Sequence, residues 1–170
     1  NSGGTRFELQ EAPDGSAYAT IYAGPNTTYT HSSLTANTTH YYKVRAVNVD
    51  NIATNYNTAK STHTMALTPG AVTFGGVWQS SITVNWTDGT NSGGTRFEVA
   101  ESADGNSYST IYAGPNTTYT HSSLTANTTH YYKVRAVNVD SIATNYNTAN
   151  STHTIAVVPG AVTIGTVTDN

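Results

Sequence analysis

Cysteine is absent from the 170-residue sequence, and charged residues make up only 10% of it. Without cysteine, neither disulfides nor thiolate metal sites can hold the fold together. Soluble domains usually carry about a quarter charged residues, so the surface of this protein must be polar yet nearly uncharged. A low charge density removes one of the usual barriers to lateral association between molecules.

A net charge of −3 argues against the basic face that nucleic-acid binding requires. The apolar runs are far too short to span a bilayer. We therefore expect no nucleic-acid partner and no membrane insertion.

The sequence contains a long internal repeat. A shift of 90 residues aligns 1–80 with 91–170 without a gap, and 17 of the 80 aligned positions differ. The block from Thr20 to Asp50 returns unchanged as Thr110 to Asp140. A period near 90 residues exceeds the roughly 20–50 residues of solenoid repeats, so each repeat is large enough to have its own core. The repeat predicts separate units in a row.

Apolar residues alternate with a period of two inside each repeat. In the stretch SITVNWT, Ile82, Val84 and Trp86 share one face, and the stretch HYYKVRAVNV alternates in the same way. Such alternation is typical of strands half buried in a sheet. Turn-forming sequences such as Asp104-Gly105 separate these stretches. About seven short strands in a unit of this size predict an all-β fold, a β-sandwich.

The motifs SITVNW, GTRFEV and LTANTTHYYKVRAVN occur in this order and resemble a fibronectin type III domain. The resemblance covers the whole chain, and its spacing resembles that of tandem copies in bacterial or archaeal surface and secreted proteins. It implies tandem immunoglobulin-like sandwiches of about seven strands. It also implies a set of structural core residues, which are Trp86, Phe97, Leu124, His130, Tyr132 and Val134.

The same resemblance divides the chain into three parts. Residues 66–155 hold one complete fibronectin type III-like unit, and residues 1–65 hold a partial unit with the family's strands C to G. Residues 156–170 hold a junction and strand A of a following unit. The first unit lacks a counterpart of the strand that carries Trp86. We therefore expect it to be completed by residues of a longer array or by strand exchange with a neighbouring molecule.

One position departs from the family pattern. Family members place a tyrosine at the corner before strand F, where its hydroxyl bonds to upstream backbone. This sequence has His40 and His130 there. We expect an imidazole N–H to reach the same kind of acceptor, and protonation of the ring to weaken the corner.

No pattern of side chains indicates chemistry. The carboxylates of Glu98, Glu101 and Asp104 lack the spacing of a catalytic pair, and the histidines lack zinc-ligand spacing. We expect no catalytic, cofactor-binding or metal-binding residues. Six Asn-x-Ser/Thr sequons are candidate glycosylation sites, although a sequence rich in Asn and Thr meets this pattern often by chance. They begin at Asn26, Asn37, Asn85, Asn116, Asn127 and Asn150.

These features predict a non-catalytic structural repeat of an extracellular or cell-surface rod, filament or adhesin stalk. Its units would associate through sandwich edges and short, stiff junctions that contain Pro69 and Pro159. The expected partners are other copies of the chain or further units of it, with glycans and surface proteins as further candidates. Two alternatives stay open: a carbohydrate- or protein-binding module that acts by avidity, and a spacer region of a secreted polysaccharide-degrading enzyme.

Overall fold

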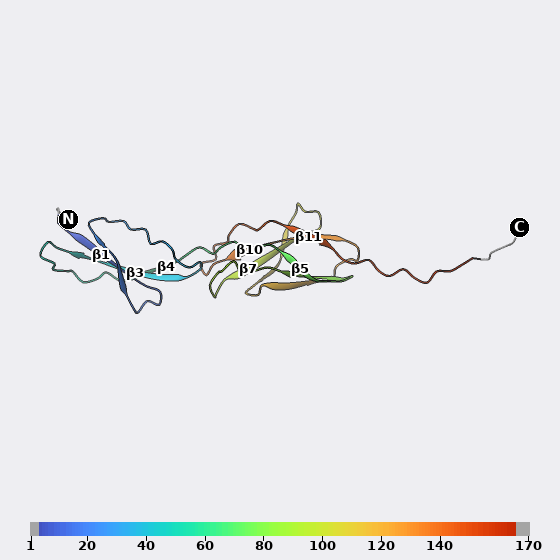
Figure 1. The fold of residues 1–170 in the computed structure, drawn as a ribbon, viewed down its shortest axis with the longest axis horizontal. Coiled ribbons are helices and arrows are strands. Elements are labelled where there is room, and N and C mark those ends of the chain that lie inside the picture. The colour runs from blue at the N-terminus through green and yellow to red at the C-terminus, as the bar shows by residue number, and fades with distance from the viewer. Residues whose placement is uncertain (1–3, 166–170) are drawn as a thin grey trace.

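The computed structural model describes residues 4–165, which form eleven strands. The strands lie in two units, one after the other along the long axis, and an extended tail follows the second unit (Figure 1). None of the described residues forms a helix that could cross a membrane. The strands are β1 (Arg6–Ala12), β2 (Ala19–Gly24), β3 (Thr39–Val47), β4 (Lys60–His63), β5 (Thr73–Val77), β6 (Ser81–Asn85), β7 (Arg96–Ser102), β8 (Ser109–Gly114), β9 (Thr118–Ser122), β10 (Thr129–Val137) and β11 (Asn150–His153).

The second unit is a sandwich of two antiparallel sheets. One sheet has the strand order β5-β6-β9 and the other has the order β11-β10-β7-β8. Seven strands in two sheets confirm the predicted all-β sandwich fold, because the alternating apolar positions of facing strands point into one shared core.

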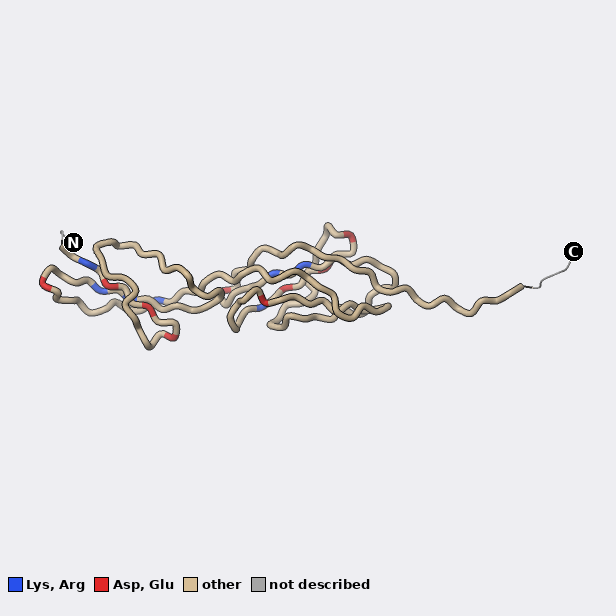
Figure 2. The backbone as a smooth tube through the Cα atoms, viewed as in Figure 1, with Lys and Arg blue, Asp and Glu red and all other residues tan. Residues whose placement is uncertain are grey.

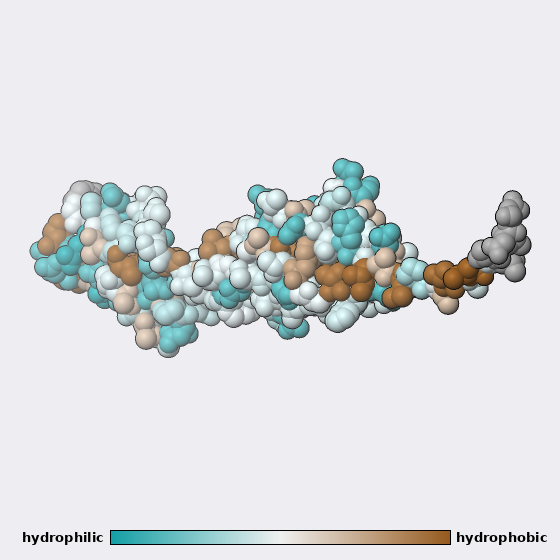
Figure 3. All heavy atoms as spheres, turned by 45° about the vertical axis from the view of Figure 1, so that its right-hand side comes forward, coloured by the Kyte–Doolittle hydropathy of each residue, from teal (hydrophilic) through white to brown (hydrophobic). Residues whose placement is uncertain are grey.

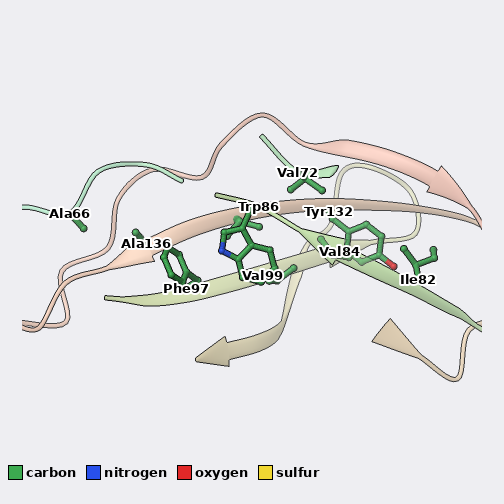
Figure 4. Close-up of a cluster of buried hydrophobic side chains, with 10 residues drawn as sticks. Ala66, Val72, Ile82, Val84, Trp86, Phe97, Val99, Tyr132 and Ala136 are labelled. Carbon is green, nitrogen blue, oxygen red and sulfur yellow. The ribbon is translucent and has the colours of Figure 1, made fainter. Parts of the chain in front are cut away.

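The core of the second unit depends on β6. Ile82 and Val84 are fully buried, and Trp86 just beyond the strand is 5% exposed. The Trp86 ring lies 6.0 Å from the ring of Phe97 in an edge-to-face arrangement (Figure 4), which is a preferred geometry for aromatic pairs. Burial of three such side chains contributes roughly 5–9 kcal/mol. That figure is comparable with the net stability of a whole domain.

The first unit has a single sheet, with the order β2-β1-β3-β4, within residues 4–65. Phe7, Leu9 and Val44 lie on the apolar face of this sheet and are only half-buried. Their counterparts in the second unit are buried by the opposing sheet. The first unit therefore has the same apolar face as the second but lacks the sheet that covers it.

One segment of identical sequence folds differently in the two units. In the second unit Thr118–Ser122 forms β9, and Tyr119 pairs with Val84 of β6. The same residues of the first unit, 28–32, form no strand, although the family resemblance implied that residues 1–65 hold all of strands C to G, with strand E among them. A strand needs a neighbour for its backbone N–H and C=O groups, and the first unit provides no counterpart of β6. The partner, and not the local sequence, decides the conformation.

We expect the amide protons of 28–32 to exchange with solvent much faster than those of Thr118–Ser122. Only the second set donates and accepts hydrogen bonds in a three-stranded sheet. Hydrogen exchange followed by NMR measures this, since resolved resonances distinguish peptides that are identical in sequence. Equal protection of the two segments would contradict the assignment of an open sheet.

Candidate interaction site

The two units meet at a junction centred on Asn37. Its backbone has a φ of 54°, a left-handed conformation that Asn tolerates better than most residues. Asn37 is 3% exposed. Its Nδ2 donates to the Thr95 hydroxyl at 2.7 Å, and its Oδ1 accepts from the Val139 N–H at 3.1 Å. The corner of the first unit is thus bonded to two different loops of the second.

Further contacts close the junction around Asn37. His63 Nδ1 lies 2.9 Å from Asp140 Oδ2, and the Ser92 N–H donates to the carbonyl of Ala36 at 3.3 Å. The neighbouring unit also covers apolar surface. Val139 is 46% exposed at the junction, whereas the same residue of the first unit, Val49, is 70% exposed.

The linker between the units is held along its length. Asn91 bonds to both backbone groups of Leu67, with its Oδ1 2.7 Å from the N–H and its Nδ2 2.9 Å from the carbonyl oxygen. Asn147 Nδ2 then donates to the carbonyl of Gly70 at 2.7 Å. Pro69 between these contacts is buried. The linker therefore has little freedom to bend.

The uncovered face of the first unit forms an apolar groove of about 330 Å³. In the second unit, Ile82, Val84 and Trp86 fill the equivalent space. The groove lies beside the segment 28–32 that has no strand partner. It is lined by Phe7, Leu9, Tyr22, Asn26, Thr27, Thr28, Tyr29 and Val44.

The tail, residues 156–165, is a second apolar surface that no other described residue buries. It is the counterpart of residues 66–75, which enter the second unit, and seven of the ten positions are identical. Val72 is 1% exposed there, but its counterpart Val162 is 88% exposed, and Ile164 is 85% exposed. The tail carries no charged residue (Figure 2), and it extends beyond the second unit with apolar side chains on its surface (Figure 3).

The predicted corner histidine makes different contacts from those expected. His130 is 8% exposed, and its Nε2 lies 2.9 Å from the hydroxyl of Thr128. That hydroxyl donates to the backbone carbonyl of Thr125 at 2.6 Å, so the ring reaches the upstream backbone through a side chain. The other ring nitrogen lies 2.7 Å from a carboxylate oxygen of Glu101. Both ring nitrogens are therefore engaged, one with a hydroxyl and one with a carboxylate.

The other predicted core residues meet in one cluster. Trp86, Phe97, Tyr132 and Val134 are buried together, and Leu124 packs against them partly buried. His130 lies at the edge of this cluster, with its ring 6.4 Å from the ring of Tyr132.

The carboxylates are engaged in structural contacts. Glu98 pairs with Arg135 at 2.7 Å, and Glu101 contacts His130. Hydrogen bonds from the Ser107 N–H, the Ser102 hydroxyl and the Asn106 N–H hold the pKa of Asp104 at about 2. A carboxyl group with such a low pKa cannot serve as a general acid near neutral pH. Within residues 4–165, no three His, Cys, Asp or Glu side chains gather as metal ligands do.

The sequons differ in accessibility. Asn26, Asn116, Asn127 and Asn150 are exposed, and Asn85 is half-buried in β6. Asn37 is buried with both side-chain atoms bonded. A glycan on Asn37 would therefore open the junction, while its counterpart Asn127 has room for one.

Comparison with solved structures places this architecture in a known fold. The two-domain fibronectin type III segment from chicken tenascin matches with a TM-score of 0.62 at 15% identity, over 88% of this chain and 84% of that one. The fold is that of a fibronectin type III tandem. The FN1–FN3 domains of chicken CNTN1 match with a TM-score of 0.49 at 14% identity, over 89% of this chain, which spans 56% of that one. No family model and no curated protein matches the chain.

The residues of the junction could not be identified from the sequence. Thr95, Val139 and Asp140 lie in loops without a chemical motif, and Asn37 was noted only as a sequon. One feature of the sequence does point to this region. The block that contains the corner and the loop after β3 is unchanged between the repeats, whereas β1 and the turn after it vary.

Acid should weaken the second unit through His121. Burial lowers the pKa of this histidine below its usual 6.5, and the neighbouring Glu101 carboxylate opposes the shift only in part. Because the unfolded chain then binds a proton more readily than the folded one, the free energy of unfolding should fall as the pH drops below about 6.5. His121→Gln should reduce this fall. Urea unfolding followed by tryptophan fluorescence measures it, since both tryptophans lie in the second unit; an unchanged pH dependence would contradict this account.

Proposed function

We propose that the chain is a non-catalytic structural segment of an extracellular rod, filament or adhesin stalk. The observation that carries this proposal is the junction around Asn37. A spacer must transmit its direction from one unit to the next, and a flexible linker of Gly and Ser cannot do so. Here hydrogen bonds, a His–Asp contact and a bonded linker fix the second unit on the first.

The composition of the surface supports a place outside the cell. The chain has no cysteine and few charges, and its exposed residues are largely Thr, Asn and Ser. Exposed sequons such as Asn26 and Asn116 suit a surface that carries glycans. A tandem of this kind in a bacterial or archaeal surface protein is the source that we favour.

The distribution of polar side chains supports a structural role and not a catalytic one. Each carboxylate on β7 is paired, with Glu98 bonded to Arg135 and Glu101 to His130. On the same sheet, the ammonium of Lys133 lies 3.7 Å from the centre of the Tyr108 ring. Such contacts hold neighbouring strands together. The first unit repeats the same pattern, as a structural feature of each unit would.

A rod stiffened by this junction should bend when Asn37 is changed to Gly. Glycine keeps the left-handed backbone conformation but removes the bonds to Thr95 and Val139. We expect a smaller radius of gyration and a broader distribution of distances in small-angle X-ray scattering at low concentration. Asn127→Gly is the matched control, since it makes the same change at the corner of the second unit, whose Asn127 side chain makes no hydrogen bond within residues 4–165. Identical scattering from all three proteins would contradict the proposal.

A further inference from the structure

We propose that each unit binds one proton at its corner, between a histidine and a glutamate, and that this proton keeps the corner in the shape that the junction needs. The pairs are His130 with Glu101 in the second unit and His40 with Glu11 in the first. The effect on the junction rests on the proposed role as a rod, whereas the bound proton itself does not.

The hydrogen bonds around Thr128 decide which ring nitrogen carries a hydrogen. The Thr128 hydroxyl lies 2.6 Å from the carbonyl oxygen of Thr125. A carbonyl cannot donate, so the single hydrogen of the hydroxyl points to it. The same hydroxyl oxygen lies 2.9 Å from Nε2 of His130. Because the hydroxyl has no second hydrogen, Nε2 of the ring must be the donor.

The other ring nitrogen then needs a hydrogen as well. Nδ1 of His130 lies 2.7 Å from Oε1 of Glu101, where two lone pairs would repel each other unless a hydrogen lay between them. An ionised carboxylate has none to give. The pair therefore holds one proton more than a neutral imidazole and a free carboxylate. Because a glutamate is ordinarily more acidic than a histidine, this proton belongs on the ring.

The first unit has the same arrangement. His40 Nδ1 lies 2.7 Å from Glu11 Oε1. His40 Nε2 lies 2.8 Å from the hydroxyl oxygen of Thr38, and this hydroxyl donates to the carbonyl of Thr35 at 2.7 Å. The four side chains of the two pairs are 10–14% exposed. Limited contact with water strengthens the attraction between a charged ring and a carboxylate.

The groups that face the ring are compatible with a positive charge there. β7 contributes Glu101, and β9 contributes His121, whose ring centre lies 6.1 Å from that of His130. Burial is the main cause that lowers the pKa of His121, and His130 lowers it further against the opposing effect of Glu101. Tyr132 of β10 stays uncharged, because burial raises its pKa far above the usual 10. His153, the one titratable residue of β11, is exposed.

Hydroxyl, ring and carboxylate lie in the order of a catalytic triad, but their hydrogens are in the wrong places for one. The histidine of a triad takes the hydrogen of the hydroxyl. Nε2 of His130 already carries a hydrogen, and Thr128 gives its own to a carbonyl. The arrangement therefore holds a proton and does not activate Thr128 as a nucleophile.

In the first unit this network lies directly beside the junction. Thr38 follows Asn37, and the Thr38 N–H donates to the hydroxyl of Thr64 at 2.9 Å. The carbonyl of Thr64 accepts in turn from Asn138 Nδ2 of the second unit at 3.5 Å. If the pair loses its proton, a ring lone pair faces the carboxylate, so the ring must turn away and release Thr38. Loss of the proton, and not its gain, would then loosen the corner and the junction.

Glu101→Gln tests the bound proton, because its amide N–H can donate to a neutral ring and needs no extra proton. In the unaltered chain, the folded second unit holds a proton that the unfolded chain releases above about pH 6.5. This contribution to stability is complete below that pH and is lost as the pH rises through the titration of the folded pair. The folding equilibrium constant should therefore fall above pH 7 by up to about tenfold per pH unit.

Urea unfolding followed by tryptophan fluorescence measures this fall, on the alkaline side of the range in which His121 acts. The fall should be absent in Glu101→Gln. It should persist in the matched control Glu98→Gln, which removes the neighbouring carboxylate that pairs with Arg135. A folding equilibrium constant that stays level between about pH 7 and pH 8 in the unaltered chain would overturn the proposal.

The nitrogen-15 resonances of the imidazole rings show the proton directly. At about pH 7.5 a free histidine is mostly neutral, yet both nitrogens of His130 and of His40 should carry a hydrogen. In Glu101→Gln, only Nε2 of His130 should carry one. Neutral rings in the unaltered chain contradict the bound proton outright.

X-ray scattering at raised pH tests the effect on the junction. At about one pH unit above the point where His40 releases its proton, the unaltered chain should show a smaller radius of gyration than at pH 7. Glu11→Gln should show no such change, whereas Glu8→Gln, whose carboxylate pairs with Arg45, should behave as the unaltered chain does. Scattering that does not change with pH would also overturn the proposal. A failure of the rod itself is distinct, since it appears at pH 7 in the comparison with Asn37→Gly.

Discussion

An apolar sheet face needs a cover, and in this protein one strand provides most of it. β6 contributes Ile82 and Val84, and Trp86 follows directly, so that the sheet of β7 and β10 is closed from water. Burial on this scale, roughly 5–9 kcal/mol, matches the margin by which domains are stable. The two units share most of their sequence, yet within residues 4–65 the first unit has no counterpart of β6 or of its partner β5. Their structural differences follow from it.

The repeat shows what local sequence decides and what it does not. Strands β1, β2, β3 and β4 form without β6 because they pair with one another. The segment 28–32 does not, since its pairing partner would be β6. Two identical segments with different conformations separate intrinsic preference from context more directly than a mutation could, because no side chain in them has changed. At the edge of the sheet, the presence of a pairing partner decides whether this segment forms a strand.

The fold could be predicted from the sequence because alternation and turns are local signals. Trp86, Phe97 and Val134 lie at apolar positions that recur with a period of two, and this pattern alone predicts that they lie in a core. The junction could not be predicted in this way. Asn37, Thr95 and Asp140 are polar loop residues whose role depends on the position of the next unit. The contact of His130 with Glu101 joins strands 29 residues apart in sequence, and only the strand register brings the two together.

Hydrogen bonds and apolar burial contribute different amounts of free energy at the junction. They therefore determine different properties of it, namely the orientation of the units and the strength of the contact. A neutral hydrogen bond contributes about 0.5–1.5 kcal/mol net, and a half-exposed pair such as His63 and Asp140 contributes about 0–1 kcal/mol. Complete burial of one valine or isoleucine contributes about 1.5–3 kcal/mol. The bonds of Asn37 therefore fix how the units are oriented, while apolar residues such as Val72 supply most of the free energy.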